Sequence, residues 1–108
     1  MAAGGSLCAR ESNRMHNVSL RVWTDLADIW EYIARDNPDA ADRTVEGLEE
    51  KFLLLGQFPE LGRERKEYRG RLRSLAVGSY VIFYRVSGAD ADIIRVLHGS
   101  QNLKEILG

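Results

Sequence analysis

The sequence has little of what marks secreted, membrane-spanning or repeat proteins. Cys8 is the only cysteine among the 108 residues, so no disulfide can form within the chain. No stretch approaches the roughly 20 apolar residues that span a bilayer. The first ten residues lack the charged start and the long apolar middle of a secretory signal. We therefore expect a cytoplasmic protein, and we expect one domain because this length supports one core but not two.

The central part of the chain, residues 71–97, predicts three consecutive β-strands. The first is bounded by Arg71 and Val77, and Gly78-Ser79 is a two-residue connection of the kind that closes a tight hairpin. Residues 80–86 are an almost unbroken run of aromatic and β-branched residues, which is typical of a central strand covered on both faces. A turn at residues 87–90 then leads into a third strand at residues 93–97.

Two helices are predicted before these strands. The first follows Ser19, a suitable N-cap, and its apolar residues recur at spacings of four, three and four. These residues are Val22, Leu26, Ile29 and Ile33. The second helix is expected from Pro38 to about Leu55, with Asn37 as its N-cap and Gly56 just beyond its end. The connection between them is short, which predicts an antiparallel hairpin lying on one face of the sheet.

The predicted fold class is α+β, an N-terminal helical hairpin on a small antiparallel sheet. A short C-terminal helix is expected after Ser100, with Leu103, Ile106 and Leu107 turned inward. Residues 1–14 are small and polar without periodicity, so we expect a disordered tail before a single domain at residues 15–108. A short edge strand near residues 14–18 is a further possibility.

Charge is distributed unevenly along the chain. Residues 1–60 carry 6 basic and 11 acidic residues, a net of −5, whereas residues 61–108 carry 9 basic and 5 acidic residues, a net of +4. Within the second half a basic segment stands out: Arg63, Arg65, Lys66, Arg69, Arg71 and Arg73. This asymmetry favours an anionic or acid-lined partner for the second half, and a solvated surface with segregated charge is the alternative.

Four blocks of the sequence resemble the ParE branch of the RelE/ParE toxin superfamily. They are Asp25-Leu-x-x-Ile-Trp-x-Tyr-Ile-Ala-Arg-Asp-Asn-Pro-x-Ala-Ala41, Phe58-Pro-x-Leu-Gly-Arg63, Leu72-Arg-Ser-Leu-x-Val-Gly-x-Tyr-Val-Ile-Phe-Tyr-Arg85 and Arg95-Val-Leu-His-Gly99. The blocks occur in order over residues 15–108, and together they are strong evidence for the superfamily.

The resemblance implies the toxin of a type II toxin–antitoxin pair, in which a helical hairpin packs on a curved antiparallel sheet. It also implies a cognate ParD-like antitoxin whose flexible C-terminal segment folds onto the toxin. We assign Trp23, Trp30 and Arg85 to antitoxin binding, since an exposed tryptophan suits a helix-in-groove contact. The alternative for both tryptophans is a place in the core.

The superfamily divides by target. ParE-like members act on DNA gyrase without a known catalytic centre, whereas RelE-like members cut mRNA on the ribosome. The ribonucleases typically carry basic residues just after the last strand and a tyrosine near the C-terminus. This sequence has Ser100, Gln101 and Leu107 in those places. Arg73 matches an arginine that the ribonucleases use, and His98 titrates near neutrality, so these two are the catalytic candidates if the chain is a ribonuclease.

We expect a gyrase inhibitor that does no chemistry and uses no cofactor and no metal. Its predicted target-binding residues are Arg63, Arg65, Arg69, Arg71 and Arg73. Direct contact of these arginines with phosphate stays open, because a guanidinium binds carboxylate and phosphate alike. Three further alternatives also stay open: a ribosome-dependent mRNA endonuclease, a non-toxic antitoxin-binding remnant, and for His98 a hydrogen-bonded place at the rim of the sheet.

Overall fold

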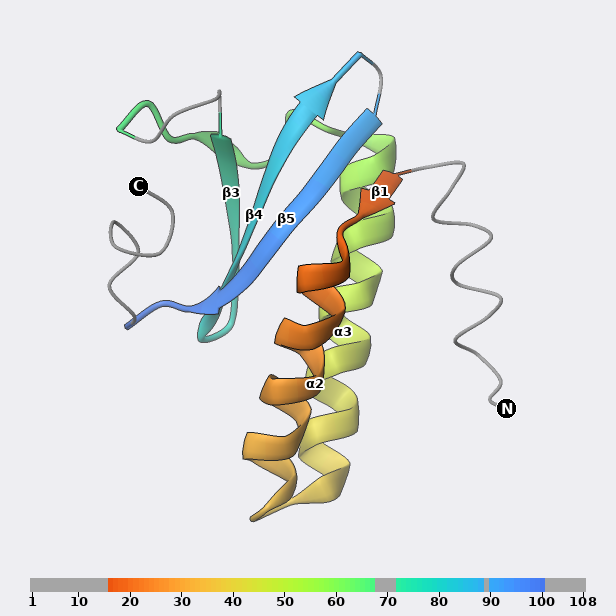
Figure 1. Cartoon of the computed structure of the whole chain (residues 1–108), viewed down its shortest axis with the longest axis vertical. Helices are drawn as coiled ribbons and strands as arrows, with labels where there is room; N and C mark the ends of the chain where they lie inside the picture. Colours follow the sequence, from red (N-terminus) through yellow and green to blue (C-terminus); the bar gives the residue numbers. More distant parts are fainter. Residues whose placement is uncertain (1–15, 68–71, 89, 101–108) are drawn as a thin grey trace.

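The computed structural model describes residues 16–67, 72–88 and 90–100, with no account of the side chains of residues 16 and 17. Two antiparallel helices cover one face of a five-stranded sheet and extend beyond its edge (Figure 1). The strand order is β1-β5-β4-β3-β2. The elements are β1 (His16–Val18), α2 (Leu20–Ala34), α3 (Pro38–Gln57), β2 (Arg63–Glu64), β3 (Leu72–Val77), β4 (Tyr80–Ser87) and β5 (Asp90–His98).

The predicted hairpin of β3 and β4 is confirmed. Val77 lies opposite Tyr80, and Gly78 has a φ of +59°, a left-handed conformation that glycine adopts without strain. Strands β3 to β5 pair antiparallel, as expected, and the short β2, which the sequence did not predict, pairs antiparallel with β3. The edge strand β1 departs from that pattern, because it runs parallel to β5 with Val18 beside Ile93.

The helix starts are also confirmed. The Ser19 side chain accepts a hydrogen bond from the backbone N–H of Val22, and Asn37 caps α3 in the same way. The helix α3 continues two residues past its expected end at about Leu55, so the expected place of Gly56 just beyond the helix was wrong: α3 ends at Gln57, and the N–H of Phe58 still bonds back to Leu54. The chain leaves α3 with φ of −131° at Phe58, so no left-handed glycine is needed there. The predicted N-terminal tail and C-terminal helix lie outside the described residues.

The core has two parts, one on each face of the sheet. The larger lies between the helices and the strands and includes the expected helical face, together with Ile82 and Tyr84 of β4. The smaller lies on the opposite face and consists of Leu72, Phe83 and Leu97. β4 is therefore buried on both faces at residues 82–84, as predicted for a central strand, but it becomes exposed from Arg85 onward.

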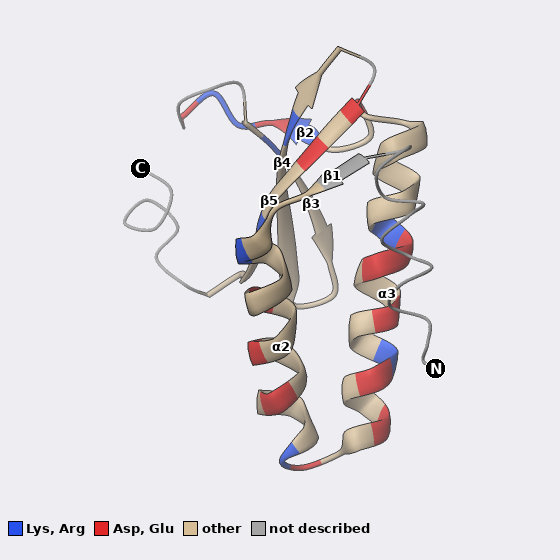
Figure 2. Ribbon diagram, turned by 45° about the vertical axis from the view of Figure 1, so that its right-hand side comes forward, with Lys and Arg blue, Asp and Glu red and all other residues tan. Residues whose placement is uncertain are grey.

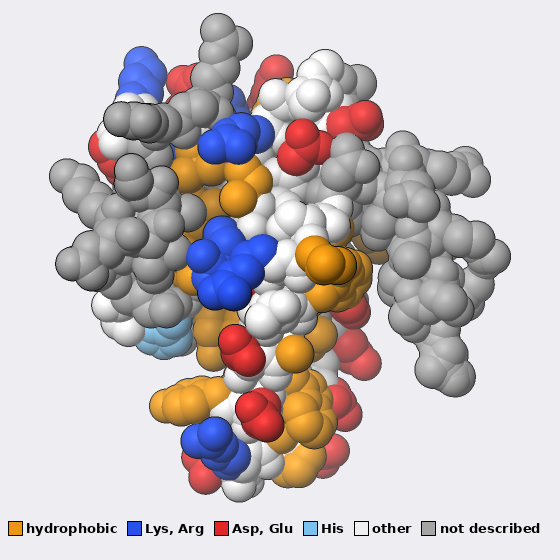
Figure 3. Space-filling view, viewed as in Figure 1, with side chains coloured by type: hydrophobic (Ala, Val, Ile, Leu, Met, Phe, Trp, Pro, Cys, Tyr) orange, Lys and Arg blue, Asp and Glu red, His pale blue; other side chains and the backbone are white. Residues whose placement is uncertain are grey.

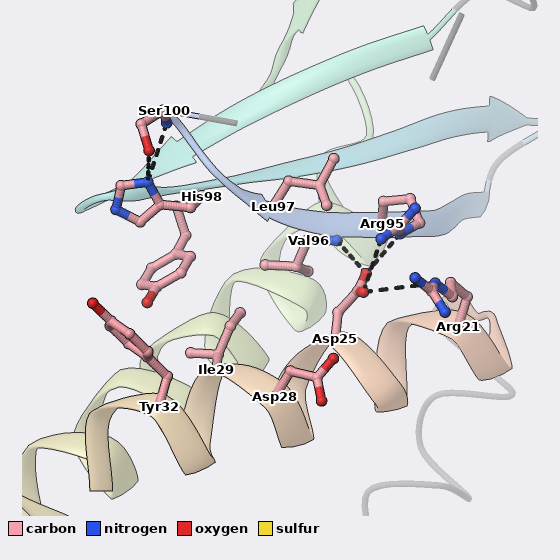
Figure 4. Close-up of a pocket in the computed structure, with 11 residues that line it drawn as sticks. Arg21, Asp25, Asp28, Ile29, Tyr32, Arg95, Val96, Leu97, His98 and Ser100 are labelled. Atoms are coloured by element: carbon pink, nitrogen blue, oxygen red, sulfur yellow. Dashed lines mark hydrogen bonds and ion pairs between the residues drawn. The ribbon is translucent and has the colours of Figure 1, made fainter. Parts of the chain in front are cut away.

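A carboxylate completes the edge of β5. β1 covers only residues 91–93 of β5, and the register then shifts by one residue. Beyond the shift, the buried side chain of Asp25 on α2 accepts a hydrogen bond from the backbone N–H of Val96 at 3.0 Å (Figure 4). The same carboxylate accepts hydrogen bonds from Nε and Nη2 of Arg95 at 2.9 and 3.1 Å. Asp25 thus provides the acceptor that a longer β1 would have supplied, and it fixes α2 along β5.

Replacing Asp25 with alanine is expected to destabilise the fold by about 3 kcal/mol, because it leaves the Arg95 charge and the Val96 N–H without their partner. Asp28→Ala is the matched control, since Asp28 is an exposed carboxylate one turn along the same helix. Urea unfolding of both variants measures the difference. Equal stability of the two variants would show that the Asp25 contacts do not stabilise the fold.

Candidate interaction site

Tyr84 holds the connector between α3 and β2, residues 58–62, against the sheet. Its buried hydroxyl donates to the carbonyl oxygen of Pro59 at 2.6 Å and accepts the backbone N–H of Gly62 at 2.8 Å. A Cβ on Gly62 would lie 2.6 Å from the carbonyl oxygen of Ser74 and 2.7 Å from the Tyr84 hydroxyl, so only glycine fits this approach. The connector is consequently fixed to the central strand by side-chain and backbone contacts.

Arg73 holds the same connector from β3. Its Nε donates to the carbonyl oxygen of Gly62 at 3.0 Å, and its Nη2 donates to that of Glu60 at 3.3 Å. Glu64 lies 3.9 Å from the guanidinium and balances part of its charge. The predicted target-binding residue Arg73 is therefore engaged with the protein's own backbone, and it positions the loop that leads into the basic segment.

Of the other described basic residues in this segment, Arg65 forms an ion pair, whereas Arg63 and Lys66 are exposed. Arg65 pairs with Glu67 at 2.8 Å, donates to the Ser74 hydroxyl at 3.1 Å and lies over the Phe83 ring. The backbone N–H of Glu67 and the neighbouring Arg65 lower the pKa of the Glu67 carboxyl, so this carboxylate stays ionised to a lower pH than a free glutamate does.

Arg63 and Lys66 are exposed, and in the described part of the chain neither forms an ion pair. Figure 2 shows basic and acidic positions interspersed around β2, whereas most of the charged positions on the two helices are acidic. Arg69 and Arg71 lie outside the described residues, so their assignment to the target surface stays a prediction.

The structure does not bring Arg73 and His98 together, contrary to what a shared acid–base site would require. Arg73 lies opposite Tyr84 and His98 lies opposite Tyr80, four residues earlier in β4. At strand spacing this separates them by about 13 Å along β4, and because β4 lies between β3 and β5, two interstrand spacings of about 4.8 Å each add to the distance.

His98 instead belongs to the rim of the sheet. Its Nδ1 accepts the backbone N–H of Ser100 at 3.1 Å and lies 2.7 Å from the Ser100 hydroxyl, and its ring meets Tyr80 edge-on. These contacts match the alternative of a hydrogen-bonded histidine that shapes the turn after β5.

A cavity of about 540 Å³ lies beside His98, between α2 and β5 (Figure 4). Burial, followed by the nearby Tyr32, raises the pKa of Tyr80 in its wall.

Both tryptophans of α2 are on the surface, so the alternative of a core position was wrong. Trp23 is 37% exposed and Trp30 is 41% exposed. Trp30 donates from its indole N–H to the carboxylate of Asp42 on α3 at 2.8 Å, which fixes its ring across the hairpin. Figure 3 shows hydrophobic side chains gathered over the helical hairpin with acidic side chains beside them. We call the outward side of α2 with Trp23 and Trp30 the tryptophan face.

Arg85 does not lie with the tryptophans. Side chains alternate along β4, and Tyr84 belongs to the core beneath the helices whereas Phe83 belongs to the opposite face. Arg85 therefore shares the face of Phe83, away from the hairpin. The three residues assigned to antitoxin binding are thus divided between two sides of the sheet.

Sequence reasoning missed the roles of Asp25 and Tyr84. Asp25 had a visible signal, since it is an acidic residue within the apolar face formed by Val22, Leu26 and Ile29. Tyr84 had none, because its run of apolar neighbours is equally consistent with a tyrosine that only fills the core. Among the described residues, no three His, Cys, Asp or Glu side chains are arranged to hold a metal ion. No helix in the same residues is long and apolar enough to cross a membrane.

Tyr84→Phe is expected to lower the free energy of unfolding by about 1–3 kcal/mol, because it leaves the Pro59 carbonyl and the Gly62 N–H without their partner. Tyr80→Phe is the matched control on the same strand and face, since no hydrogen bond of the Tyr80 hydroxyl is present in the described part of the chain. Urea unfolding compares the two, and equal stabilities would refute the role of the Tyr84 hydroxyl.

Comparison with known proteins identifies the family. The family model of the ParE toxin of type II toxin–antitoxin systems, parDE, matches residues 17–103. Toxin ParE1 of Caulobacter vibrioides is 38% identical over 95 residues, which cover 86% of this chain and 97% of that protein. Toxin ParE3 of the same organism is 34% identical over 85 residues, covering 78% and 85%. Toxin ParE1 of Mycobacterium tuberculosis is 35% identical over 78 residues, covering 71% and 74%.

A solved structure, the chromosomal ParDE TA system from P. aeruginosa, has the same fold. It superposes with a TM-score of 0.64 over 78% of this chain and 96% of that chain, at 22% sequence identity. The helical hairpin on an antiparallel sheet therefore matches both the sequence resemblance and a known structure. The family model alone spans most of the chain, and the chain belongs to the ParE toxin family of type II toxin–antitoxin systems.

Proposed function

We propose that this ParE-family toxin inhibits DNA gyrase and is held inactive by a cognate ParD-like antitoxin in a hetero-oligomer. Gyrase as the target follows from the family resemblance, in which ParE-like members act on that enzyme. The same proposal places the protein in the cytoplasm, where gyrase acts. The observation that carries the choice of target binding over RNA cleavage is the engagement of Arg73 with the carbonyl oxygens of Glu60 and Gly62.

This observation favours binding over RNA cleavage for a specific reason. Cutting an RNA backbone needs a group that moves a proton and a cation that meets the phosphate, both at one phosphodiester. Arg73 is committed to the connector, and His98 is bonded to Ser100 about 13 Å further along the sheet. Neither is placed to act on the phosphate that the other would meet. This arrangement fits a surface that binds a protein target better than it fits a ribonuclease site.

The tryptophan face is the proposed antitoxin contact. It offers two large aromatic rings on one helix, beside the acidic residues of the hairpin. An antitoxin segment with apolar residues at helical spacing and basic residues between them complements this surface. To contact Arg85 as well, the antitoxin segment has to continue around the sheet to the face opposite the helices. A disordered chain that becomes ordered on binding is able to follow such a path.

Purified toxin is expected to inhibit gyrase supercoiling of plasmid DNA at stoichiometric amounts and to leave mRNA intact on translating ribosomes. Addition of the antitoxin should restore supercoiling. The two assays are run in parallel with the same toxin preparation. Cut mRNA beside unaffected gyrase would establish the endonuclease instead, and no effect in either assay would favour a non-toxic remnant.

Trp23→Ala and Trp30→Ala are each expected to weaken antitoxin binding by about 10- to 100-fold, as is usual for buried aromatic anchors. Gyrase inhibition by the same variants should stay at the wild-type level. Tyr32→Ala is the control, because Tyr32 is an exposed aromatic residue of α2 that lines the cavity beside His98 instead. Calorimetric titration with the antitoxin gives the affinities. Unchanged affinity in both tryptophan variants would exclude this face as the contact.

A further inference from the structure

Residues 58–61 of the connector form a turn that exposes two apolar side chains to solvent. The N–H of Leu61 bonds to the carbonyl oxygen of Phe58 at 3.0 Å, and Pro59 occupies the second position of this turn, where its fixed φ is favoured. The first and fourth residues of such a turn have Cα atoms within about 7 Å of each other. Phe58 is 58% exposed and Leu61 is 48% exposed. Two large apolar groups thus lie near each other on the surface, with no covering residue in the described part of the chain.

Side chains of the sheet hold the turn in one conformation. Tyr84 binds the Pro59 carbonyl and the Gly62 N–H, and Arg73 binds the carbonyls of Glu60 and Gly62. A loop tethered by four hydrogen bonds loses little conformational freedom when a partner binds it, so more of its contact energy appears as affinity.

The charge around the turn favours a protein over a nucleic acid. Residues 58–67 contain three basic residues and three acidic ones, a net charge of zero. Glu60 lies between the two apolar residues in the turn, where it would repel a phosphate backbone, and Arg65 is already paired with Glu67. The exposed cations Arg63 and Lys66 follow directly in the chain. An apolar pocket for Phe58 and Leu61, with carboxylates at the edge that meets Arg63 and Lys66, complements this combination.

We infer that residues 58–62 form a docking loop that places Phe58 and Leu61 in an apolar pocket, edged by carboxylates, on the toxin's target protein. The inference rests on the proposed function in one respect, that the toxin acts by binding a protein. It assigns the loop to the target and not to the antitoxin, because the loop adjoins the basic segment whereas the tryptophan face lies among acidic residues. Arg73 and Tyr84 are positioning residues for this loop.

The test uses Phe58→Ala and Leu61→Ala, separately and together, in the full chain. Leu20→Ala is the matched control, since Leu20 is an apolar residue at the start of α2 with 83% exposure. Each variant is titrated against purified gyrase and the antitoxin, and each is induced in cells without antitoxin to score growth arrest. Phe58→Ala is expected to weaken gyrase binding by about 30-fold, the loss typical of an aromatic anchor. Antitoxin affinity and thermal stability should stay unchanged, and Leu20→Ala should behave as the wild type in every assay.

Three outcomes overturn the inference. The first is a Phe58→Ala/Leu61→Ala double variant that binds gyrase and arrests growth like the wild type. The second is a double variant that loses antitoxin binding instead of gyrase binding. The third is wild-type toxin that binds duplex DNA alone at physiological salt through these two residues.

Failure of the proposed function is recognised separately. Wild-type toxin that arrests growth but leaves gyrase unaffected would remove gyrase as the target. The growth assay would still decide the inference in that case. If the double variant no longer arrests growth while its stability and antitoxin binding are intact, the result supports a docking loop for another protein target. Wild-type toxin without either effect would overturn both.

Discussion

The exposed end of this molecule depends on one buried hydroxyl. Tyr84 lies in the middle of the central strand with its ring in the core, and its oxygen bonds two backbone groups of the connector. A buried hydroxyl without partners costs on the order of 2–7 kcal/mol, so core packing and connector position are coupled. The connector in turn sets where β2 begins and where the basic segment reaches the surface. A core residue thereby determines the geometry of the surface that we propose for target binding.

Asp25 does for the helical hairpin what Tyr84 does for the connector. Apolar packing alone would hold α2 against the sheet without fixing its position along β5, because hydrophobic attraction has no direction. The bonds from Asp25 to Arg95 and Val96 supply that direction. With about 3.6 residues per turn, a helix oriented by Asp25 carries Trp23 and Trp30 on its outward side. The position of the tryptophan face therefore follows from a contact on the opposite side of the same helix.

The sequence predicted features that depend on near neighbours and missed those that depend on distant ones. The apolar periodicity of α2, the caps at Ser19 and Asn37, and the Gly78 hairpin are local signals, and all were confirmed. The parallel pairing of β1 with β5, the Asp25–Arg95 pair and the Tyr84 clamp join residues that are 22 or more positions apart. No pattern within a window of sequence encodes such contacts. The candidate site was predicted as a basic segment, but which of its arginines are engaged internally became visible only from the folded chain.

The two proposed surfaces differ in charge and in construction, which bears on the proposal that one small chain binds two partners. The tryptophan face is a helix surface among carboxylates, and the docking loop is a tethered turn beside cations. The proposed antitoxin segment, with basic residues between its apolar ones, complements the first surface, whereas the exposed Arg63 and Lys66 beside the second complement the carboxylates proposed on the target. Since neither surface includes the residues of the other, an antitoxin bound only to the tryptophan face would leave the docking loop uncovered. The length of the antitoxin segment, more than its affinity for the tryptophans, would then decide whether the toxin is silenced.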